Sequence, residues 1–408
     1  MEKRLIPQLR FPEFTSSWEK KYIKSIAKVV GGGTPSTTND EYWNGEINWF
    51  TPTEIKFNVV SESNRKITEL GLNNSSATIL PKGTILLTTR ATIGEVAIAQ
   101  EECTTNQGFQ SLIVNKSNSN QFVFDLIKVY RNELYKRANG STFKEISKKE
   151  IEKIKVLIPQ LPEQQKIASF LTDVDAKITQ LTKKKELLEQ YKKGIMQKIF
   201  SQELRFKDDN GNEFPKWEVK KLGDICKIKS SKRVIQEDWK DKGVPFYRTR
   251  EIISLSENKE FRTPIFITEK MYDELIKKYG VPKENDILVT GVGTIGKTYK
   301  VRKDDRFYFK DGNVLWIKIN NKINSEFLHQ QFNTRFIRKQ LSDNASITTV
   351  ATFTIDGARN TIIKIPSIEE QTKIANFLSD IDIKIEVLNT KIENSKAFKK
   401  GLLQQMFV

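Results

Sequence analysis

The segment from Gly291 to Thr298 reads GVGTIGKT and matches the pattern of a phosphate-binding loop. Such a loop holds a Mg²⁺-bound nucleotide with backbone N–H groups, a lysine and a hydroxyl, and a helix must follow it. Here Tyr299 to Arg306 predict a strand and a turn, and the matching segment of the first half, Thr89 to Val96, has no Lys-Thr. The pattern therefore favours a strand–turn–strand element, with a P-loop ATPase as the alternative.

A second set of residues, Asp40, Glu54 and Lys56, loosely follows the acid and Glu-x-Lys spacing of nucleases. This spacing arises often in a highly charged chain, and the matching Glu251-Ile252-Ile253 has no lysine. No Asn-Pro-Pro-Tyr-like motif of adenine methyltransferases is present, and no Gly-x-Gly-x-x-Gly opens a βαβ unit. The sequence thus shows no recognisable catalytic machinery, and a nuclease acting on DNA is a further alternative.

The remaining reactive side chains are few: one histidine, His329, and two cysteines, Cys103 and Cys226. A zinc site of His and Cys would need more ligands. A Ser-His-Asp triad would have to use His329, and no Gly-x-Ser-x-Gly elbow accompanies it. We therefore expect His329 to be structural and the chain to bind no metal. Two cysteines far apart in the sequence cannot form a stabilising disulfide framework, and they indicate a reducing, cytoplasmic location.

The composition is that of a globular protein with a polyanionic partner. The 408 residues suffice for two or three domains. They include 38% hydrophobic and 29% charged residues, and 68 Lys+Arg against 51 Asp+Glu give a net charge of +17. Such a balance favours nucleic acid as partner. No stretch approaches the ~20 apolar residues of a transmembrane helix, and the N-terminus does not predict a signal peptide.

The chain repeats itself. The segment EQQKIASFL from Glu163 matches EQTKIANFL from Glu370, 207 residues later, and the match continues without a gap to Phe200 and Phe407. Upstream, Thr92-Ile93-Gly94 matches Thr294-Ile295-Gly296, with the offset varying by a few residues. Loop insertions between shared strands produce such shifts. The sequence therefore predicts a variable unit and a helix, followed by the same pair again.

Both helical segments have the apolar spacing of a coiled coil, with steps of three and four residues. Lys185 interrupts the first seam, and the second breaks near Ser395. Ser367 and Glu370 predict a capping box at the start of the second helix. Because neither helix can bury its stripe alone, we expect the two to pack on each other and to offer a docking surface. The seam residues are Ile167, Leu171, Val174, Ile178 and Leu181 in the first helix, and Ile374, Leu378, Ile381, Ile385 and Leu388 in the second.

The two variable units read as mixed α/β domains, which makes the fold class α+β with a pseudo-two-fold internal repeat. Short apolar or alternating runs predict strands at 84–89, 95–99, 111–115, 286–290 and 314–319. Amphipathic patterns predict helices at 122–137 and 325–341. Residues 208–212 have the composition of a turn or linker.

Polar loops and basic residues of the variable units are the candidate DNA contacts. The flexible loop Gly31 to Thr38 offers N–H groups and hydroxyls to phosphates, and Arg248 and Arg250 stand where the first half has Thr51 and Thr53. Arginine can donate two hydrogen bonds to guanine. Arginine in one unit and threonine in the other is therefore the kind of difference expected of two domains that bind different base sequences. The candidates are Gly32, Gly33, Thr34, Ser36, Trp43, Arg65, Arg90, Thr92, Lys144, Ser231, Lys232, Arg233, Arg248, Arg250, Thr294, Lys297 and Arg302.

This ordered set, present twice, resembles the specificity subunit of type I restriction–modification enzymes over essentially the whole chain. The resemblance rests on the Gly-Gly-Thr-Pro-Ser loop before Tyr42-Trp43, the Thr-Ile-Gly turns and the paired Pro-x-x-Glu-Gln-x-Lys-Ile-Ala-x-Phe-Leu helices. The second unit departs from the pattern, because its corresponding loop lacks Gly-Gly-Thr-Pro.

The resemblance implies target recognition domains at 1–160 and 202–365 and conserved helices at 161–201 and 366–408. Each domain would read one half of a split, asymmetric double-stranded DNA site, and the helices would form an antiparallel coiled coil. Two methyltransferase subunits would dock on the helices, joined by restriction subunits. S-adenosylmethionine, ATP and Mg²⁺ would belong to those partners, and this chain would be non-catalytic. A scaffold that binds DNA without sequence preference is the remaining alternative.

Overall fold

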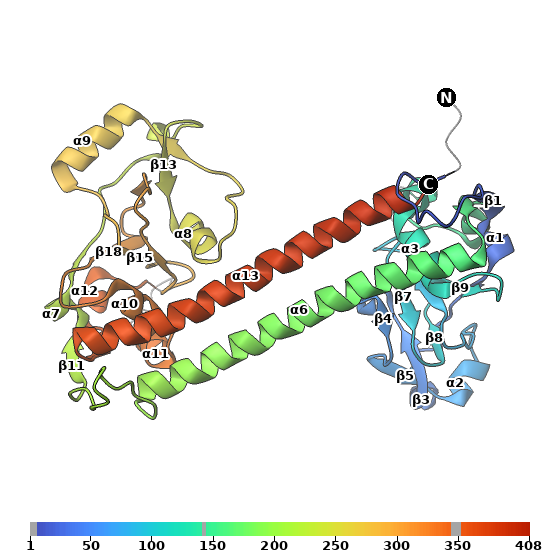
Figure 1. Ribbon diagram of the computed structural model, residues 1–408, viewed down its shortest axis with the longest axis horizontal. Helices are drawn as coiled ribbons and strands as arrows, with labels where there is room; N and C mark the ends of the chain where they lie inside the picture. The colour runs from blue at the N-terminus through green and yellow to red at the C-terminus, as the bar shows by residue number, and fades with distance from the viewer. Residues whose placement is uncertain (1–5, 141–143, 344–351) are drawn as a thin grey trace. The chain divides into compact units, whose positions relative to one another are not determined.

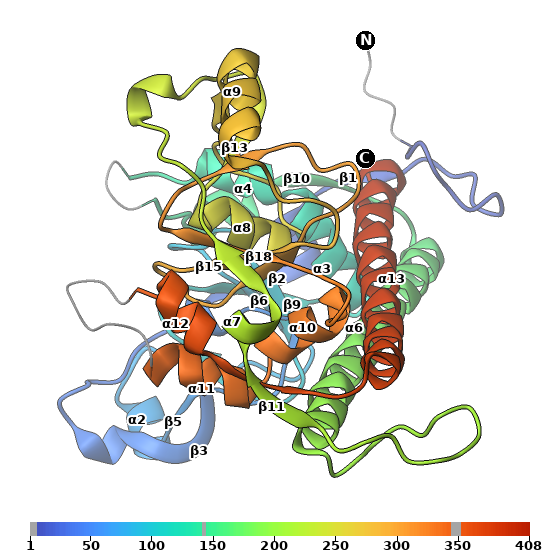
Figure 2. The same ribbon diagram turned by 90° about the vertical axis from the view of Figure 1, so that its left-hand side faces the viewer.

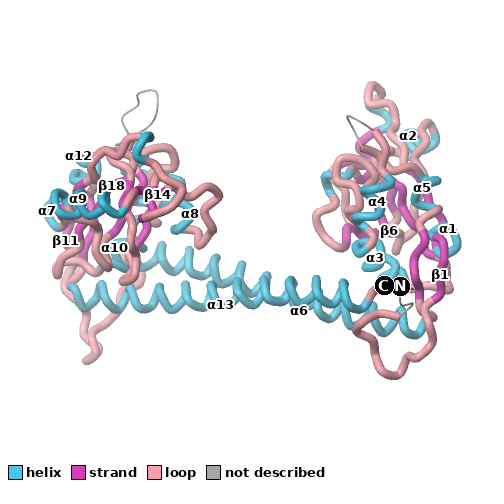
Figure 3. Tube along the Cα trace, turned by 90° about the horizontal axis from the view of Figure 1, so that it is seen from above, coloured by secondary structure: helices cyan, strands magenta, loops and turns pink. Residues whose placement is uncertain are grey.

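The computed structural model describes residues 6–140, 144–343 and 352–408. The chain divides into two compact units: unit 1 comprises Met1–Thr182 with Thr390–Val408, and unit 2 comprises Lys183–Asn389. Two long helices, α6 (Leu161–Ser201) and α13 (Ile368–Met406), each contribute one part to unit 1 and the other part to unit 2 (Figure 1). All strands lie outside these two helices (Figure 3).

Unit 1 holds three small sheets. β1 and β10 form an antiparallel pair, a five-stranded sheet has the order β2-β9-β6-β7-β4, and a three-stranded sheet has the order β5-β3-β8, with β3 and β8 parallel. The strands are β1 (Glu19–Tyr22), β2 (Ala27–Gly31), β3 (Trp43–Phe50), β4 (Val59–Val60), β5 (Arg65–Ile67), β6 (Ile85–Leu87), β7 (Val96–Ala99), β8 (Cys103–Thr105), β9 (Gln110–Val114) and β10 (Lys155–Ile158). The shorter helices are α1 (Ile23–Ile26), α2 (Glu69–Asn73), α3 (Asn120–Val129), α4 (Arg131–Arg137) and α5 (Lys148–Glu152).

Unit 2 repeats this topology without a counterpart of β4. β11 pairs with β19, a four-stranded sheet has the order β12-β18-β15-β16, and a three-stranded sheet has the order β14-β13-β17, again with one parallel pair. The strands are β11 (Glu218–Lys221), β12 (Lys227–Lys229), β13 (Val244–Tyr247), β14 (Phe266–Ile267), β15 (Ile287–Thr290), β16 (Thr298–Lys300), β17 (Tyr308–Phe309), β18 (Val314–Lys318) and β19 (Ile362–Ile365). The helices are α7 (Leu222–Ile225), α8 (Thr249–Ser256), α9 (Glu269–Tyr279), α10 (Ser325–Phe332), α11 (Arg335–Asp343) and α12 (Ile355–Asn360). The match confirms the predicted α+β fold class and its internal repeat.

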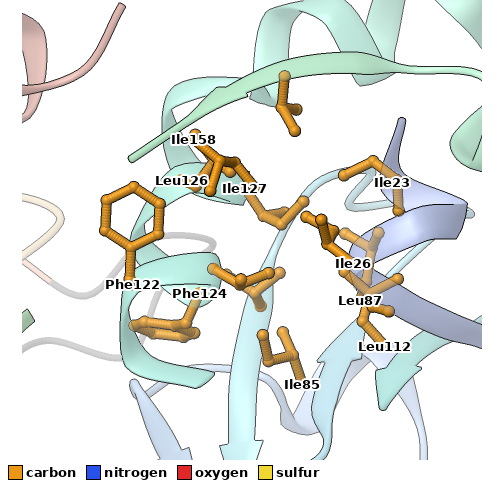
Figure 4. Packing of buried hydrophobic residues seen from close by; sticks show 14 of the residues in the cluster. Ile23, Ile26, Ile85, Leu87, Leu112, Phe122, Phe124, Leu126, Ile127 and Ile158 are labelled. Atoms are coloured by element: carbon orange, nitrogen blue, oxygen red, sulfur yellow. The ribbon is translucent and has the colours of Figure 1, made fainter. Parts of the chain in front are cut away.

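Each unit closes its core with a long helix. In unit 1, Phe122 and Leu126 of α3 pack with Ile85 of β6 in a cluster that also contains Leu171 of α6 and Phe407, which follows α13 (Figure 4). In unit 2, Phe327 of α10 packs with Ile374 and Leu378 at the start of α13. Figure 2 shows the two helices α10 and α13 of this unit. The predicted seam residues Ile167, Leu171, Ile374, Leu378, Ile381 and Leu388 are buried, and Val174, Ile178, Leu181 and Ile385 are partly buried.

Within each unit, α6 and α13 run antiparallel and are joined by one ion pair of a lysine. In unit 1, Lys399 of α13 lies 2.5 Å from Asp175 of α6, and in unit 2, Lys192 of α6 lies 2.6 Å from Asp382 of α13. Lys399 lies 207 residues after Lys192, and Asp382 lies 207 residues after Asp175, so the two ion pairs are equivalent in the repeat. The lysine comes from α13 in unit 1 and from α6 in unit 2. Lys185, which interrupts the apolar seam, donates to Asn389 in unit 2 at 3.0 Å.

Lys399 and Lys192 also contact a helix outside the long pair, which is α3 in unit 1 and α10 in unit 2. In unit 1, Asp125 of α3 is fully buried and lies 3.8 Å from Lys399, while Lys128 of the same helix donates to Asn58 at 2.8 Å. In unit 2, the matching contact is from Lys192 to Gln330 of α10 at 2.9 Å. These polar junctions fix each domain core on its long helix, because a buried charge is tolerated only beside its partner.

We expect unit 1 to gain stability with pH through Lys128. Burial, and secondarily the nearby Lys399, lower the pKa of Lys128 to about 8. Between pH 8 and 10 the unfolded chain therefore binds the proton that the folded chain has lost, so stability rises with pH, by at most about 1 kcal/mol per pH unit. Urea midpoints at pH 7 to 10 should show this rise in the wild type relative to Lys128→Met. Parallel curves for the two proteins would contradict it.

Three sequence expectations need correction. The helix expected over 122–137 is two helices, α3 and α4, joined at Tyr130, and that over 325–341 is α10 and α11, separated at Asn333 and Thr334. The second break has a local cause, because the Thr334 hydroxyl accepts from the Ile337 N–H as α11 begins. The capping box at α13 is half present: the Ser367 hydroxyl accepts from the Glu370 N–H at 3.3 Å, but the Glu370 carboxylate binds elsewhere.

The described part of the chain has no helix with both the length and the apolar character needed to cross a membrane.

Candidate nucleic-acid interface

In unit 1, loops from several strands meet at one end of the sheets. The Gly33 N–H donates to Thr105 at 2.8 Å, the Thr89 N–H to Gly108 at 2.8 Å, and the Asn106 N–H to Phe50 at 3.0 Å. These bonds bring together the loops after β2, β3, β6 and β8. The candidates Gly32, Gly33, Thr34, Ser36, Trp43, Arg90 and Thr92 lie on or next to these loops.

The glycines of the first loop serve packing. A Cβ on Gly32 would stand 2.1 Å from the Asn106 carbonyl oxygen, and one on Gly33 would stand 2.3 Å from the Ala77 backbone nitrogen. The Thr34 hydroxyl donates to Gln107, and the Ser36 hydroxyl lies 2.8 Å from that of Thr38. Residues 32–34 of the segment are therefore packed against neighbouring loops, including the loop after β8. The two glycines are needed because no other residue allows this close approach.

Arg65 is an exposed cation that stacks on an aromatic pair of this unit. Its guanidinium carbon lies 3.5 Å from the centre of the Trp43 ring, and the Trp43 indole N–H donates to the Ser36 carbonyl at 3.0 Å. Trp49 meets Trp43 edge to face and donates to the Gly33 carbonyl at 2.8 Å. No carboxylate pairs with Arg65 among the described residues. The two indoles thus hold a flat guanidinium whose N–H groups are available to a ligand.

The other cationic candidates of unit 1 have partners within the unit. Arg90 forms an ion pair with Glu145 at 2.9 Å, and the Lys144 ammonium lies 4.2 Å from the centre of the Tyr135 ring. The Thr92 carbonyl accepts from the Thr88 hydroxyl within the turn after β6. Exposed pairs such as Arg90–Glu145 are weak, so a stronger anion can replace the carboxylate.

In unit 2, the two arginines that differ from the first half share one carboxylate. Glu251 accepts from Arg248 at 2.7 Å and from Arg250 at 2.7 Å. Burial acts to raise the pKa of Glu251, but these hydrogen bonds outweigh it and hold the pKa below its ordinary value. The Arg248 side chain is 18% exposed and that of Arg250 is 54% exposed. Arg250 is therefore better placed for an outside ligand, and Arg248 anchors the start of α8.

The segment resembling a P-loop is a tight turn between β15 and β16. The Gly291 N–H donates to Asn313 at 2.8 Å, the Gly296 N–H donates to Thr290 at 2.9 Å, and Lys297 pairs with Glu257 at 3.1 Å. The element that follows is β16, not a helix. This geometry contradicts the P-loop alternative, because the Gly291 and Gly296 N–H groups are already bonded and the loop is followed by a strand, so no helix N-terminus faces it. Thr294 repeats the role of Thr92, accepting from the Thr290 hydroxyl.

The other candidates of unit 2 divide into two places. Ser231 donates to the Phe309 carbonyl, the Lys232 N–H donates to the Tyr308 hydroxyl, and Arg233 follows them as an exposed cation. Arg302 lies beyond β16, at the opposite end of the β15–β16 hairpin from Lys297, since Val301 and Asp286 pair there. The structure thus does not bring Arg302 together with Lys297.

Two of the residues that suggested other chemistry, Glu54 and His329, have structural partners. The Glu54 carboxylate accepts from the Thr51 N–H and from the Asn64 N–H, each at 2.7 Å, and so closes the loop after β3. His329 lies 2.9 Å from the Thr298 hydroxyl, and burial lowers its pKa. Among the described residues, no three His, Cys, Asp or Glu side chains are grouped as a metal site.

The sequence reasoning missed a buried anchor that occurs once in each unit. Glu163, near the start of α6, accepts two hydrogen bonds of 2.7 Å from Arg10 and one of 3.1 Å from the Trp18 indole. Glu370, near the start of α13, accepts from Arg205 at 2.6 Å and from the Trp217 indole at 3.1 Å. The available signal was the repeated Leu-Arg-Phe at residues 9–11 and 204–206, upstream of each tryptophan.

Comparisons with known proteins agree with this architecture. The family model of the type I restriction modification DNA specificity domain matches residues 15–190 and again residues 215–395. The type I restriction enzyme MjaIX specificity subunit of Methanocaldococcus jannaschii is 35% identical over 277 residues, which are 63% of this chain and 64% of that protein, so the alignment spans less than two thirds of the relative. The MjaVIII specificity subunit of the same organism is 25% identical over 97% of this chain and 92% of its own length.

A crystal structure of the S subunit of a type I restriction-modification system from M. genitalium shares the fold, with a TM-score of 0.59 at 15% identity over 99% of both chains. The family model matches twice and covers most of the sequence, in agreement with the duplicated strand order and the duplicated Arg–Glu–Trp anchor. The chain belongs to the family of type I restriction–modification specificity subunits.

Proposed function

We propose that the chain directs a type I restriction–modification complex to a bipartite, asymmetric DNA site, with one half-site read by each unit. The observation that carries the proposal is that the two units have similar folds but present different arginine environments on the loops and helices around their sheets. Unit 1 presents Arg65 on two indoles, whereas unit 2 presents Arg250 beside Glu251. Different hydrogen-bonding groups on equal scaffolds select different base edges, and the net charge of +17 supplies the salt-dependent attraction to phosphates.

The partners are those that a specificity subunit requires. Two methyltransferase subunits dock on the long helices, and restriction subunits join them. S-adenosylmethionine, ATP and Mg²⁺ serve the chemistry of those subunits. The complex works in the cytoplasm, where the buried Cys103 and Cys226 stay reduced; burial raises the pKa of both thiols to about 12, which further protects them.

The test is to exchange one domain and map methylation. The chain is expressed with its cognate methyltransferase subunit in a host that lacks the system, and methylated adenines are located by single-molecule sequencing. We expect a split motif that disappears without this chain. Replacing residues 1–160 by the corresponding domain of another specificity subunit should change one half of the motif and leave the other intact.

Two results would contradict the proposal. A change in both half-sites after the exchange would show that the domains do not read independently. The absence of any new motif, in a complex shown to be assembled and active, would favour a scaffold without sequence preference.

A further inference from the structure

Unit 2 contains a basic groove between the last turns of α6, the first turns of α11 and strand β19. Its volume is about 1030 Å³. Its cationic lining residues are Lys192, Lys193, Arg335, Arg338, Lys339 and Lys364. Glu189 is the one acidic side chain among the described residues that line it, and Met196, Phe200 and Phe336 make part of the lining apolar. We call this feature the α11 groove.

The cations of α11 share one exposed face of the helix. Arg335, Arg338 and Lys339 stand at positions i, i+3 and i+4, and all three are exposed. Within the described ranges, Arg335, Lys339 and Lys193 form no ion pair, and Arg338 donates to the neutral Asn333 side chain at 3.1 Å. Like charges at this spacing repel each other. An anion bound between them would remove that repulsion.

Helix α11 links the groove to the candidate DNA contacts of unit 2. Leu341, near the end of α11, packs beside the Thr-Ile-Gly turn, since a Cβ on Gly296 would stand 2.4 Å from the Leu341 Cδ1 atom. Leu341 and Ile337 are buried in the same cluster, against which Ile295 of the turn packs. Six helical residues separate Leu341 from Arg335, which is about 9 Å along the axis. This distance corresponds to about three base steps of one DNA strand, so a duplex lying on the turn also reaches the groove.

Unit 1 differs from unit 2 at the matching places. α4 follows α3 as α11 follows α10, but its first turn contains Glu133, and its Arg131 pairs with Glu95 at 2.7 Å. The position of Lys364 in β19 is taken in β10 by Leu157, which is buried. A protein partner bound by both units alike would need the same cations in both. The difference therefore favours a ligand that is bound once, and a single DNA duplex is such a ligand.

We propose that the α11 groove holds backbone phosphates of the DNA duplex beside the half-site that unit 2 reads. Arg335 and Lys339 donate to phosphate oxygens, and the apolar side chains of Met196 and Phe336 contact the deoxyribose between them. Because phosphates carry no base identity, the groove adds affinity without adding sequence preference, and it does so at one half-site only. This inference rests on the proposed function, which supplies the duplex, and it assigns residues that hold its backbone.

The experiment compares DNA binding by the assembled complex at several salt concentrations. The wild-type chain and the double variant Arg335→Gln with Lys339→Gln are each assembled with the cognate methyltransferase subunit and titrated with a fluorescent duplex that carries the methylated motif. Each phosphate contact contributes about 0.9 to the slope of log K against log salt, so losing two should reduce the slope by roughly 2. The affinity at about 0.1 M salt should fall at least tenfold, whereas the methylated motif should stay the same.

Neutral methylphosphonate groups, placed one at a time in the duplex, locate the contact. At a few adjacent phosphates they should weaken binding by the wild-type complex but not by the double variant, which has already lost the two cations. These phosphates should lie beside one half-site only, and that half-site should be the one that changes when residues 202–365 are exchanged.

A matched control removes two charges of the same unit that already have carboxylate partners. Arg306 pairs with Glu269, and Arg359 pairs with Asp356. Arg306→Gln with Arg359→Gln should therefore change the salt slope by less than about 0.5, although the net charge falls by the same amount. Because the replaced side chains of both double variants are exposed, both should melt at the temperature of the wild type.

The outcomes separate failure of this inference from failure of the proposed function. A wild-type complex without sequence-specific DNA binding would overturn both. An unchanged salt slope in the Arg335 and Lys339 double variant, or an equal loss in the control, would overturn the groove alone. A double variant that no longer holds the methyltransferase subunit would also overturn it, because the groove would then be a protein-binding surface.

Discussion

Replacing Glu370 by glutamine should lower the free energy of unfolding of unit 2 by about 3 kcal/mol, the scale expected when one partner of a buried ion pair is removed. Glu370 is fully buried, and it holds both the Arg205 guanidinium and the Trp217 indole. A neutral amide of the same shape leaves the Arg205 charge without its counter-ion. Glu163→Gln should do the same to unit 1 through Arg10 and Trp18.

The neighbouring Glu369 provides the control for this experiment. It lies in the same first turn of α13 but is exposed, so Glu369→Gln should change stability by no more than about 0.5 kcal/mol. Urea denaturation with hydrogen exchange of peptides from each unit would locate the loss. Replacing Arg205 and Glu370 together by leucine should recover part of it, since an apolar pair needs no counter-ion. Equal urea midpoints for Glu370→Gln and Glu369→Gln would show that the Glu370 ion pair does not stabilise unit 2.

Replacing Arg65 by lysine should relax the sequence preference of one half-site while the salt dependence of DNA binding stays the same. The guanidinium carbon lies 3.5 Å from the centre of the Trp43 ring, and the guanidinium donors form a fixed fork that an ammonium group does not reproduce. A two-bond contact to a base is worth about 1–3 kcal/mol, so discrimination at one position should fall roughly ten- to hundredfold. Because the charge is kept, the electrostatic slope should not change.

Methylome mapping and binding titrations at several salt concentrations would measure both effects in the assembled complex. The matched control is Arg137→Lys, because Arg137 of unit 1 is not a candidate DNA contact and already pairs with Glu133 and Glu150. We expect little change there. Wild-type discrimination in the Arg65→Lys complex would show that Arg65 holds a phosphate, where lysine serves equally well.

The architecture could be predicted from the sequence because its signals are periodic and duplicated. The seam of α13 is a heptad pattern, and the strands at Ile85–Leu87 and Ile287–Thr290 are short apolar runs before the same Thr-Ile-Gly turn. Because the same pattern occurs in both halves of the chain, the interpretation of one half supports that of the other. The division of Asn120–Arg137 into two helices was not predictable, since a break of one residue barely disturbs the apolar pattern.

The partners of the candidate arginines could not be predicted, because they depend on contacts between side chains that the sequence pattern does not specify. Arg248 and Arg65 look alike in the sequence, yet Glu251 neutralises the first, while Trp43 supports the second without a carboxylate. Nor does a sequence show that the Glu370 carboxylate turns away from its own helix end toward Arg205. Which arginine is available to a ligand is decided by these neighbours.

The anchor segments have one difference that bears on how the chain is made. In unit 2 the Leu204 N–H bonds to Lys198 just before it in the chain, whereas in unit 1 the Leu9 N–H bonds to Gln405, and Trp18 packs on Phe407. Unit 2 is one continuous segment, but unit 1 needs residues 390–408 as well as its first 182. During synthesis, the unit whose first residues emerge first is therefore the unit that receives its final segment last. Until the end of α13 has been made, the core of unit 1 stays open beside Trp18.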